Sequence, residues 1–416
     1  MALSYIWLSF FLLAFIIAAG KWLFLQDPTI FKVMVDGIFK SAGDSVELSF
    51  KLIGIMTLFL GFMNIGEKAG AIRFLSRIVG PFFSRLFPEV PKGHPAMGHM
   101  MMNFSANLLG LDNAATPFGL KAMESLQELN PRKETASNAQ IMFLALHASG
   151  LTIIPVSIIA MRASVTPPAA NPADIFIPCM IATFVATVAA LVIVSMKQKI
   201  RLWQPVILGW ILGISAIIGL LISYIRFFLD AAGIERFSGV VSNGLILLIF
   251  MVFLLGAFRK KINVFEVFTE GAKGGFDIAI RIIPYLVAML VAISVLRTSG
   301  AFDYLISGLQ QLFTFLGFQT DFVSALPTAL MKPLSGSGAR GMMIDTMTRY
   351  GADSFAGRLS AIFQGSSDTT FYVVAVYFGS VAVRNTRYAI PAMLLADLAG
   401  IITAILVAYL FFGGSL

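Results

Sequence analysis

Two runs of polar residues interrupt a sequence that is otherwise strongly apolar. The run at 103–117 holds amides, hydroxyls and a carboxylate among glycine and proline, and the run at 332–340 joins two cations to serines and glycines. Each is followed by a further interruption, at 147–155 and at 364–370. Backbone amides and carbonyls in hydrocarbon need partners, so such breaks are tolerated at membrane depth only inside protein or beside water. The four breaks are therefore the candidates for a binding site.

The chemistry available at these breaks is binding. Free N–H groups at the start of a half-helix hold an anionic or polar solute, and unwound carbonyls hold a cation. Close helix packing through glycine and serine is the simpler alternative, but it does not require polar breaks in pairs. The predicted solute-binding residues are Asn107, Asp112, Asn113, Thr116, His147, Ser149, Thr152, Ser335, Ser337, Arg340, Gln364, Ser366, Asp368 and Thr369.

Two carboxylates and one imidazole stand out within apolar surroundings. An ionised carboxylate there costs at least ~2.5 kcal/mol, so Asp368 and Asp397 each need a partner or a proton. Because Asp368 also lies in a break, we expect it to hold a coupling cation or its proton, whereas Asp397 fits a buried structural hydrogen bond equally well. His147 either titrates and donates to a solute or is merely packed. His94 and His99 have no carboxylate in register, so no metal site is predicted.

Nucleotide chemistry and catalysis find no support in the sequence. The segment 336–341 matches G-x-G-x-x-G, but no strand precedes it and Pro333 stands just ahead, and no G-x-x-x-x-G-K-[ST] loop occurs. No nucleophile and base form a pair, so no catalytic residues and no cofactor are predicted. Transport would be passive or coupled to an ion, with Na⁺ and H⁺ both left open. The single Cys179 excludes an intrachain disulfide.

The elements that position these residues must lie in lipid. Of 416 residues, 58% are apolar and 12% are charged, and the mean hydropathy is +0.86, which is more apolar surface than one soluble core hides. Several segments reach the ~18–20 apolar residues that cross a bilayer. The nine predicted membrane spans are 3–24, 48–65, 138–160, 175–196, 205–224, 244–258, 283–296, 361–383 and 390–412. Segments 72–86 and 302–316 are amphipathic, which predicts helices at the membrane interface.

An internal repeat relates the two halves of the chain. The span at 205–224 has no counterpart and separates the halves, so the second half should be inverted relative to the first. The sequence therefore predicts a repeat at 1–200, a connecting helix with an external loop at 201–241, and an inverted repeat at 242–416. The matching segments are 30–37 with 264–271, 70–75 with 300–305, 107–113 with 333–340, 147–152 with 364–369, and 177–178 with 390–391.

The basic residues indicate how the chain is oriented. With a cytoplasmic N-terminus and both polar runs as re-entrant hairpins, the basic clusters at 196–201 and 259–261 lie in the cytoplasm, as the positive-inside rule requires. The C-terminus is then external. The net charge of +8 lies mostly in loops beside apolar segments, which fits topology and anionic lipid headgroups and not nucleic acid. The predicted partners are a small-molecule solute and membrane lipid, with a homo-oligomer left open.

Two long motifs resemble a known family. The run at 107–123, NLLGLDNAATPFGLKAM, resembles the signature of the spore maturation protein A family, and the run at 332–341, KPLSGSGARG, resembles that of the spore maturation protein B family. The chain thus looks like a fusion of the two, one in each half. The resemblance implies a nucleoside recognition (Gate) domain, which also occurs in concentrative nucleoside transporters and in the membrane part of ferrous iron transporter B. The GTPase domain of that iron transporter is absent.

Three classes of function follow from these features. The first is a transporter in the bacterial cytoplasmic membrane that moves a small polar solute, nucleoside-like or a small carboxylate, by alternating access. The second is a membrane scaffold or regulator of envelope or spore maturation, which predicts that the broken segments are packed shut. The third is an intramembrane enzyme, for which the sequence offers no residues. A fold of about nine transmembrane helices with two re-entrant hairpins fits the first class best.

Overall fold

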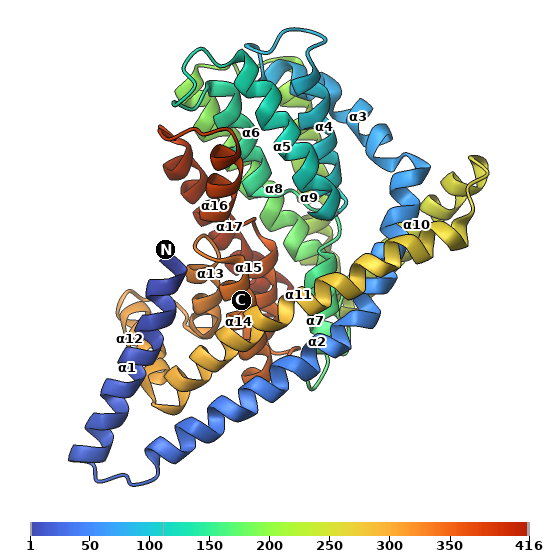
Figure 1. Ribbon diagram of the computed structural model, residues 1–416. Helices are drawn as coiled ribbons and strands as arrows, with labels where there is room; N and C mark the ends of the chain where they lie inside the picture. The colour runs from blue at the N-terminus through green and yellow to red at the C-terminus, as the bar shows by residue number, and fades with distance from the viewer. Residues whose placement is uncertain (1, 111, 414–416) are drawn as a thin grey trace. The chain divides into compact units, whose positions relative to one another are not determined.

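The computed structural model describes residues 2–110 and 112–413, without the side chains at 2–4, 112–114, 231, 232, 235, 278, 279 and 281. This part of the chain is nearly all helical and contains no strand (Figure 1). The elements are α1 Ala2–Phe24, α2 Ile30–Ala69, α3 Ala71–Leu86, α4 Pro95–Leu108, α5 Asp112–Leu129, α6 Asn138–Ser149, α7 Val156–Ser164, α8 Phe176–Gln198, α9 Pro205–Phe228, α10 Ala231–Arg259, α11 Val264–Thr298, α12 Ala301–Phe315, the 3-10 helix η1 Asp321–Ala325, α13 Leu326–Met331, α14 Gly336–Tyr350, α15 Phe355–Gly365, α16 Thr370–Val373, the π-helical turn η2 Val374–Phe378 and α17 Ala389–Phe412.

Seven helices in the described residues are long and apolar enough to cross a membrane. They lie within α1, α2, α8, α9, α10, α11 and α17, and so confirm an all-α membrane protein. The other two predicted spans, at 138–160 and 361–383, are not single helices. The first is divided into α6 and α7, and the second into α15, α16 and η2. The breaks fall at the polar residues that suggested interruption in the sequence.

The order of elements in the first half recurs in the second. Each half has a very long helix, α2 or α11, that ends at a glycine in the left-handed region, and a short amphipathic helix then begins. The glycines are Gly70, with φ 93°, and Gly300, with φ 86°. A helical hairpin, a broken helix and a long apolar helix follow in both halves. This order agrees with an internal repeat, while the inverted orientation of the second half stays a prediction.

Both amphipathic helices leave apolar side chains uncovered by protein. In α3, Val79 and Phe82 are buried against the rest of the bundle, while Ile78, predicted to share their face, is 41% exposed. In α12 only Phe302 and Ile306 are buried. Leu305 and its apolar neighbours on α12 remain exposed, as expected for a helix that contacts lipid.

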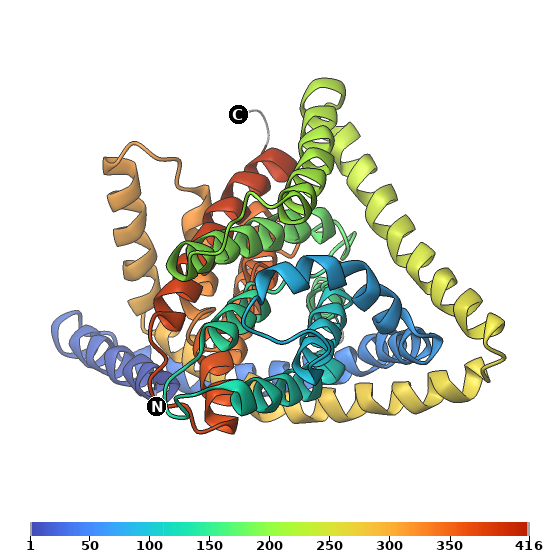
Figure 2. The ribbon, with the colours of Figure 1, turned by 90° about the horizontal axis from the view of Figure 1, so that it is seen from above.

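The chain divides into two compact units, each assembled from both halves of the sequence. Unit 1 comprises 1–60, 157–172 and 272–364, and unit 2 comprises 61–156, 173–271 and 365–416. The helices α2 and α11 each contribute to both units. The turn at 260–263 joins α10 to α11 and can be followed in Figure 2.

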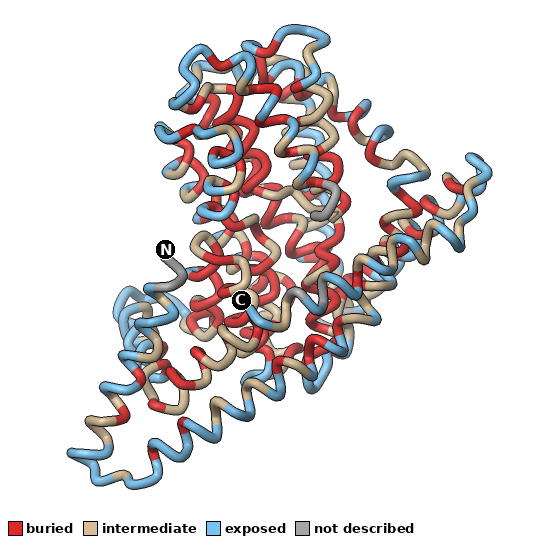
Figure 3. The backbone as a smooth tube through the Cα atoms, in the orientation of Figure 1, coloured by how far each residue is buried: buried red, intermediate tan, exposed pale blue. Residues whose placement is uncertain are grey.

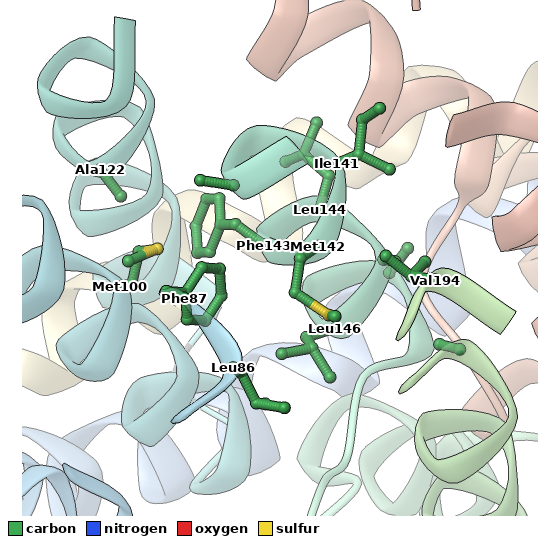
Figure 4. Close-up of a cluster of buried hydrophobic side chains, with 14 of the residues drawn as sticks. Leu86, Phe87, Met100, Ala122, Ile141, Met142, Phe143, Leu144, Leu146 and Val194 are labelled. Carbon is green, nitrogen blue, oxygen red and sulfur yellow. The ribbon is translucent and has the colours of Figure 1, made fainter. Parts of the chain in front are cut away.

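The best packed part of unit 2 surrounds α6. This helix is buried along almost its whole length and touches α4, α8 and α17, so it lies in the interior of the bundle (Figure 3). Phe143 and Leu146 of α6 meet Phe87 and Met100 in a dense apolar cluster (Figure 4). A capping box fixes the start of α6, because the Ser137 hydroxyl accepts from the Gln140 amide and the Gln140 side chain accepts from the Ser137 amide. The end of α6 is thereby held in a defined place.

Candidate functional site

The first helical hairpin packs directly on the break that follows α6. Gly110, between α4 and α5, has φ 70°, a conformation that L side chains rarely adopt, and a Cβ there would meet the Ile154 carbonyl oxygen. The Ile153 amide donates to the Leu108 carbonyl at 2.8 Å. Glycine is therefore required at 110, because two stretches of broken backbone make contact there.

The break at 366–369 reaches the same place from the other half of the sequence. The Asp368 amide donates to the Ala148 carbonyl at 2.7 Å. Gly150 ends α6 with φ 57°, and a Cβ added to it would lie 3.4 Å from the Asp368 amide nitrogen. Three of the four predicted breaks thus meet within unit 2, and they satisfy part of their exposed backbone on one another.

His147 is the centre of the polar side chains at this meeting point. It is 5% exposed, and its Nδ1 lies 3.0 Å from the Asn103 Oδ1 and 2.8 Å from the Asn107 Nδ2. Its Nε2 lies 3.7 Å from the Asp368 Oδ2, which is ion-pair range. The Asp368 side chain is 46% exposed, so one member of this pair is buried and the other is open.

The Asn103 amide determines which nitrogen of His147 carries hydrogen. The Asn103 Nδ2 donates to the Ala115 carbonyl at 2.7 Å, so its Oδ1 is the atom that faces the imidazole. An amide oxygen only accepts, so the hydrogen bond to Asn103 requires Nδ1 to be protonated and to donate, and the Asn107 amide group lies against the same nitrogen. The Nε2 that faces Asp368 then carries a lone pair in neutral histidine and a hydrogen in the imidazolium. Nε2 is therefore the imidazole atom that the Asp368 carboxylate faces.

Tyr377 closes one side of the imidazole. Its ring stands edge-on to His147 with 4.7 Å between the ring centroids, and its hydroxyl lies within hydrogen-bonding reach of Thr116 and Asn103. Tyr377 lies in η2, and the irregular turn there places the ring beside α6. Gly119 of α5 permits the approach, because a Cβ there would lie 2.6 Å from the Tyr377 ring.

The remaining predicted residues of unit 2 line the same breaks. The Ser149 hydroxyl donates to the Leu146 carbonyl and the Thr152 hydroxyl donates to the Gly150 carbonyl, so both close their own turns. Ser366 and Thr369 are buried, and the Thr369 amide donates to the Asp368 Oδ1 at 2.7 Å. The side chains of two further predicted residues lie outside the described part of the chain, namely Asp112 and Asn113.

The second hairpin lies in unit 1 and is described by itself. Ser335 caps α14, since its Oγ accepts from the Gly338 amide at 3.0 Å and lies 3.2 Å from the Ser337 Oγ. Arg340 follows in the first turn of α14, where it is half-buried. Gln364, at the end of α15, is 7% exposed, and its Oε1 has no hydrogen-bond partner among the described residues. The expected approach of this hairpin to the breaks of unit 2 stays a prediction.

Three contributors are not in the predicted solute-binding set, although Asn103 and Thr370 lie within the polar breaks that the sequence singled out. Asn103 lies one helical turn before Asn107, and that spacing was a signal that both amides share a face of α4. Tyr377 lies in an apolar span, where a phenol needs a polar partner. The Thr370 hydroxyl donates to the Asp397 Oδ2 at 2.6 Å, which gives Asp397 the structural role considered for it. Two other histidines have local partners, His94 at the start of α4 and His99 with Ser125.

Described residues that are nearly all helical, with seven helices apolar and long enough to cross a membrane, helical hairpins and helices broken at polar residues, define a multi-pass membrane protein of a transporter-like family. The family model described as Gate, "Nucleoside recognition", matches residues 49–165 and 279–384, more than half of the chain, and the chain belongs to this family. Both hairpins and both broken helices lie within the matched residues.

Two relatives match different shares of the chain. Spore maturation protein B of Bacillus subtilis (strain 168) is 45% identical over 175 residues, which is 42% of this chain and 97% of that protein. Spore maturation protein A of the same organism is 40% identical over 158 residues, which is 38% of this chain and 80% of that protein. Each covers part of the chain, as in a fusion of the two. No solved structure matches the chain.

Proposed function

We propose that the chain is a secondary transporter of the bacterial cytoplasmic membrane that moves a small polar solute, nucleoside-like or a small carboxylate. The observation that carries this proposal is the His147–Asp368 pair, set where three helix breaks meet in unit 2. Broken helices of this kind line solute and ion sites in transporters, because their free backbone groups replace water.

The pair supplies the coupling chemistry. A proton held between Nε2 of His147 and Asp368 neutralises the carboxylate, and Na⁺ at Asp368 does the same while the imidazole is neutral. Coupling arises because the solute-loaded and empty states differ in their affinity for that cation. Asn107 and Thr116 would orient the solute beside this pair in unit 2, and the polar hairpin at Ser335–Arg340 of unit 1 is a second predicted place of solute contact.

A closed membrane scaffold is the second candidate, and the close packing of the breaks favours it. The hydrogen bond from Ile153 to Leu108 and that from Asp368 to Ala148 join the breaks backbone to backbone. A transporter shows such contacts in an occluded state, whereas a scaffold keeps them throughout. Flux therefore separates the two functions.

The test is uptake of radiolabelled uridine and of radiolabelled succinate by proteoliposomes under a pH gradient or a Na⁺ gradient. We expect one of these solutes to accumulate, and Asp368→Asn to lower its flux by about tenfold or more, since a lost charged contact of this kind is worth about 1.5–3 kcal/mol. Ser337→Leu, which blocks the second hairpin, should act in the same direction. The matched control is Glu270→Gln, an exposed carboxylate of unit 2.

Each variant must elute as a single species in detergent and unfold within a few degrees of the wild type. Under that condition, wild-type flux in both Asp368→Asn and Ser337→Leu places the site elsewhere. Absence of flux for both solutes under both gradients, with a folded wild type, favours the scaffold.

A further inference from the structure

Unit 1 contains a cavity of about 470 Å³ that none of the predicted solute-binding residues line. Its walls come from the first half of α2, the segment after α7, the end of α11 and the second half of α14. Small-molecule sites commonly have volumes of ~300–1,000 Å³. Six of the lining residues are serine or threonine and six are charged, so the cavity suits a polar ligand.

The α2 wall carries charges of both signs on one helical face. Lys40, Asp44, Glu47 and Lys51 follow each other at intervals of three or four residues, which places them in one row. Glu47 and Lys51 pair with each other at 2.7 Å, and the Lys51 ammonium also donates to the Thr166 hydroxyl at 2.9 Å. Within the described residues Lys40 and Asp44 form no ion pair, so a cation and a carboxylate one turn apart remain available to a ligand.

Arg297 of α11 supplies a fixed donor on the opposite wall. Its Nε donates to both carboxylate oxygens of Asp345, at 2.6 and 2.8 Å, its Nη2 also contacts Asp345, and its guanidinium lies 3.9 Å from the Phe302 ring centroid. These contacts hold the guanidinium in one orientation. The Nη1 is buried and has no hydrogen-bond partner in the part of the chain that the structure describes. Its N–H groups therefore suit an oxyanion.

The lining residues also indicate how deep in the membrane the cavity lies. Lys40 and Asp44 precede the apolar segment of α2 that begins near Leu48, and Arg297 follows the apolar segment of α11 that contains Leu290. The charged end of the cavity therefore falls just beyond the ends of two apolar stretches, and Leu48 and Leu290 line its apolar end. This is the level at which lipid headgroups lie.

We propose that this cavity binds a zwitterion, with the phosphate or carboxylate of the ligand on Lys40 and the Arg297 Nη1 and its ammonium on Asp44. The three lining cations are balanced by three lining carboxylates, so an ion of a single sign gains little, whereas a ligand with both signs satisfies Lys40 and Asp44 together. Phosphoethanolamine has this chemistry, either free or as the headgroup of phosphatidylethanolamine. The inference does not rest on the proposed transport of a solute.

The test uses the full chain in detergent and two probes. Native mass spectrometry measures bound phosphatidylethanolamine in competition with phosphatidylglycerol, and equilibrium dialysis measures radiolabelled phosphoethanolamine. Lys40→Gln and Asp44→Asn should each weaken binding by about tenfold or more, because each removes a charged contact. The matched controls are Lys32→Gln and Asp36→Asn, which change the same charges about two turns earlier on α2, outside the cavity lining.

Binding of the lipid alone identifies a headgroup site, and binding of free phosphoethanolamine identifies a site open to water. Either result supports the proposal when the two cavity variants lose that binding and the two control variants keep it. Phosphatidylglycerol bound as tightly as phosphatidylethanolamine, with no loss in Asp44→Asn, overturns it, because the site then recognises only an anion. Equal binding of both probes by the wild type and by all four variants also overturns it.

Discussion

At the scale of single residues, the site in unit 2 depends on one buried amide. Asn103 is 1% exposed and contacts the Ala115 carbonyl, the His147 imidazole and the Tyr377 hydroxyl, so it joins α4 to α5, α6 and η2. Its oxygen keeps hydrogen on Nδ1 of His147 and leaves Nε2 to face Asp368. A residue outside the predicted solute-binding set thus orients the imidazole that faces Asp368.

Asn103→Leu tests this role. The substitution removes the side-chain donor to the Ala115 carbonyl and one of the two amide partners of the His147 Nδ1 in a buried place, and an unsatisfied buried group costs about 1–3 kcal/mol. We expect a lower midpoint of thermal unfolding in detergent than for Asn107→Leu, one turn later on α4, where Asn107 is less buried and contacts only His147. Equal midpoints for the two variants would mean that Asn103 does not organise the site.

The sequence predicted the polar residues of the site better than their contacts. Asn107, His147 and Asp368 were chosen because each is polar within an apolar stretch, and the structure places all three together. Asn103 lay in the first polar run but was left out of the predicted set, and Tyr377 was missed, because the importance of both comes from packing between elements far apart in sequence. Burial cannot be deduced from residue type alone, since the partner elements are not local.

At the scale of elements, the breaks matter as much as the helices. The hairpin tip at Gly110 rests against the Ile154 carbonyl, and the left-handed glycine allows the two chains to approach. The break positions were predictable because glycine and polar groups in an apolar span are unstable in lipid. The ends of the helices were not predictable. The spans predicted at 48–65 and 283–296 are parts of the much longer α2 and α11, because hydropathy reports contact with lipid and a charged segment can continue the same helix.

Gly110→Ala should destabilise the hairpin. Alanine at φ 70° is strained, and its Cβ meets backbone that cannot move aside, so we expect a loss of about 1–3 kcal/mol. Gly98→Ala is the matched control in α4, where a Cβ meets nothing within 4 Å and helix propensity should raise stability slightly. Thermal unfolding of both proteins in detergent gives the comparison. A Gly110→Ala protein as stable as the control shows that the tip can rearrange.

At the scale of the whole molecule, the predicted topology can be mapped with single cysteines. The native Cys179 is buried, so Cys179→Ser should give a background that an impermeant maleimide does not label. Thr29→Cys should react in intact cells, whereas Lys199→Cys and Lys261→Cys should react only after permeabilisation, because the predicted topology puts both basic clusters in the cytoplasm. The opposite labelling pattern would show that the chain has the opposite orientation. Labelling of positions 199 and 261 from different sides would contradict the predicted inverted repeat.

The lengths of α2 and α11 have a mechanical consequence. At 40 residues, α2 is about 60 Å long, twice the ~30 Å thickness of the hydrocarbon layer. A single straight helix, or rod, of this length must extend beyond the layer or cross it at a strong tilt from the membrane normal. Within unit 1 the two rods touch backbone to backbone, since a Cβ at Gly275 would lie 2.5 Å from the Thr57 Cα. Both helices continue without a break into unit 2 a few residues beyond that contact, so neither unit can be produced alone without cutting through α2 and α11.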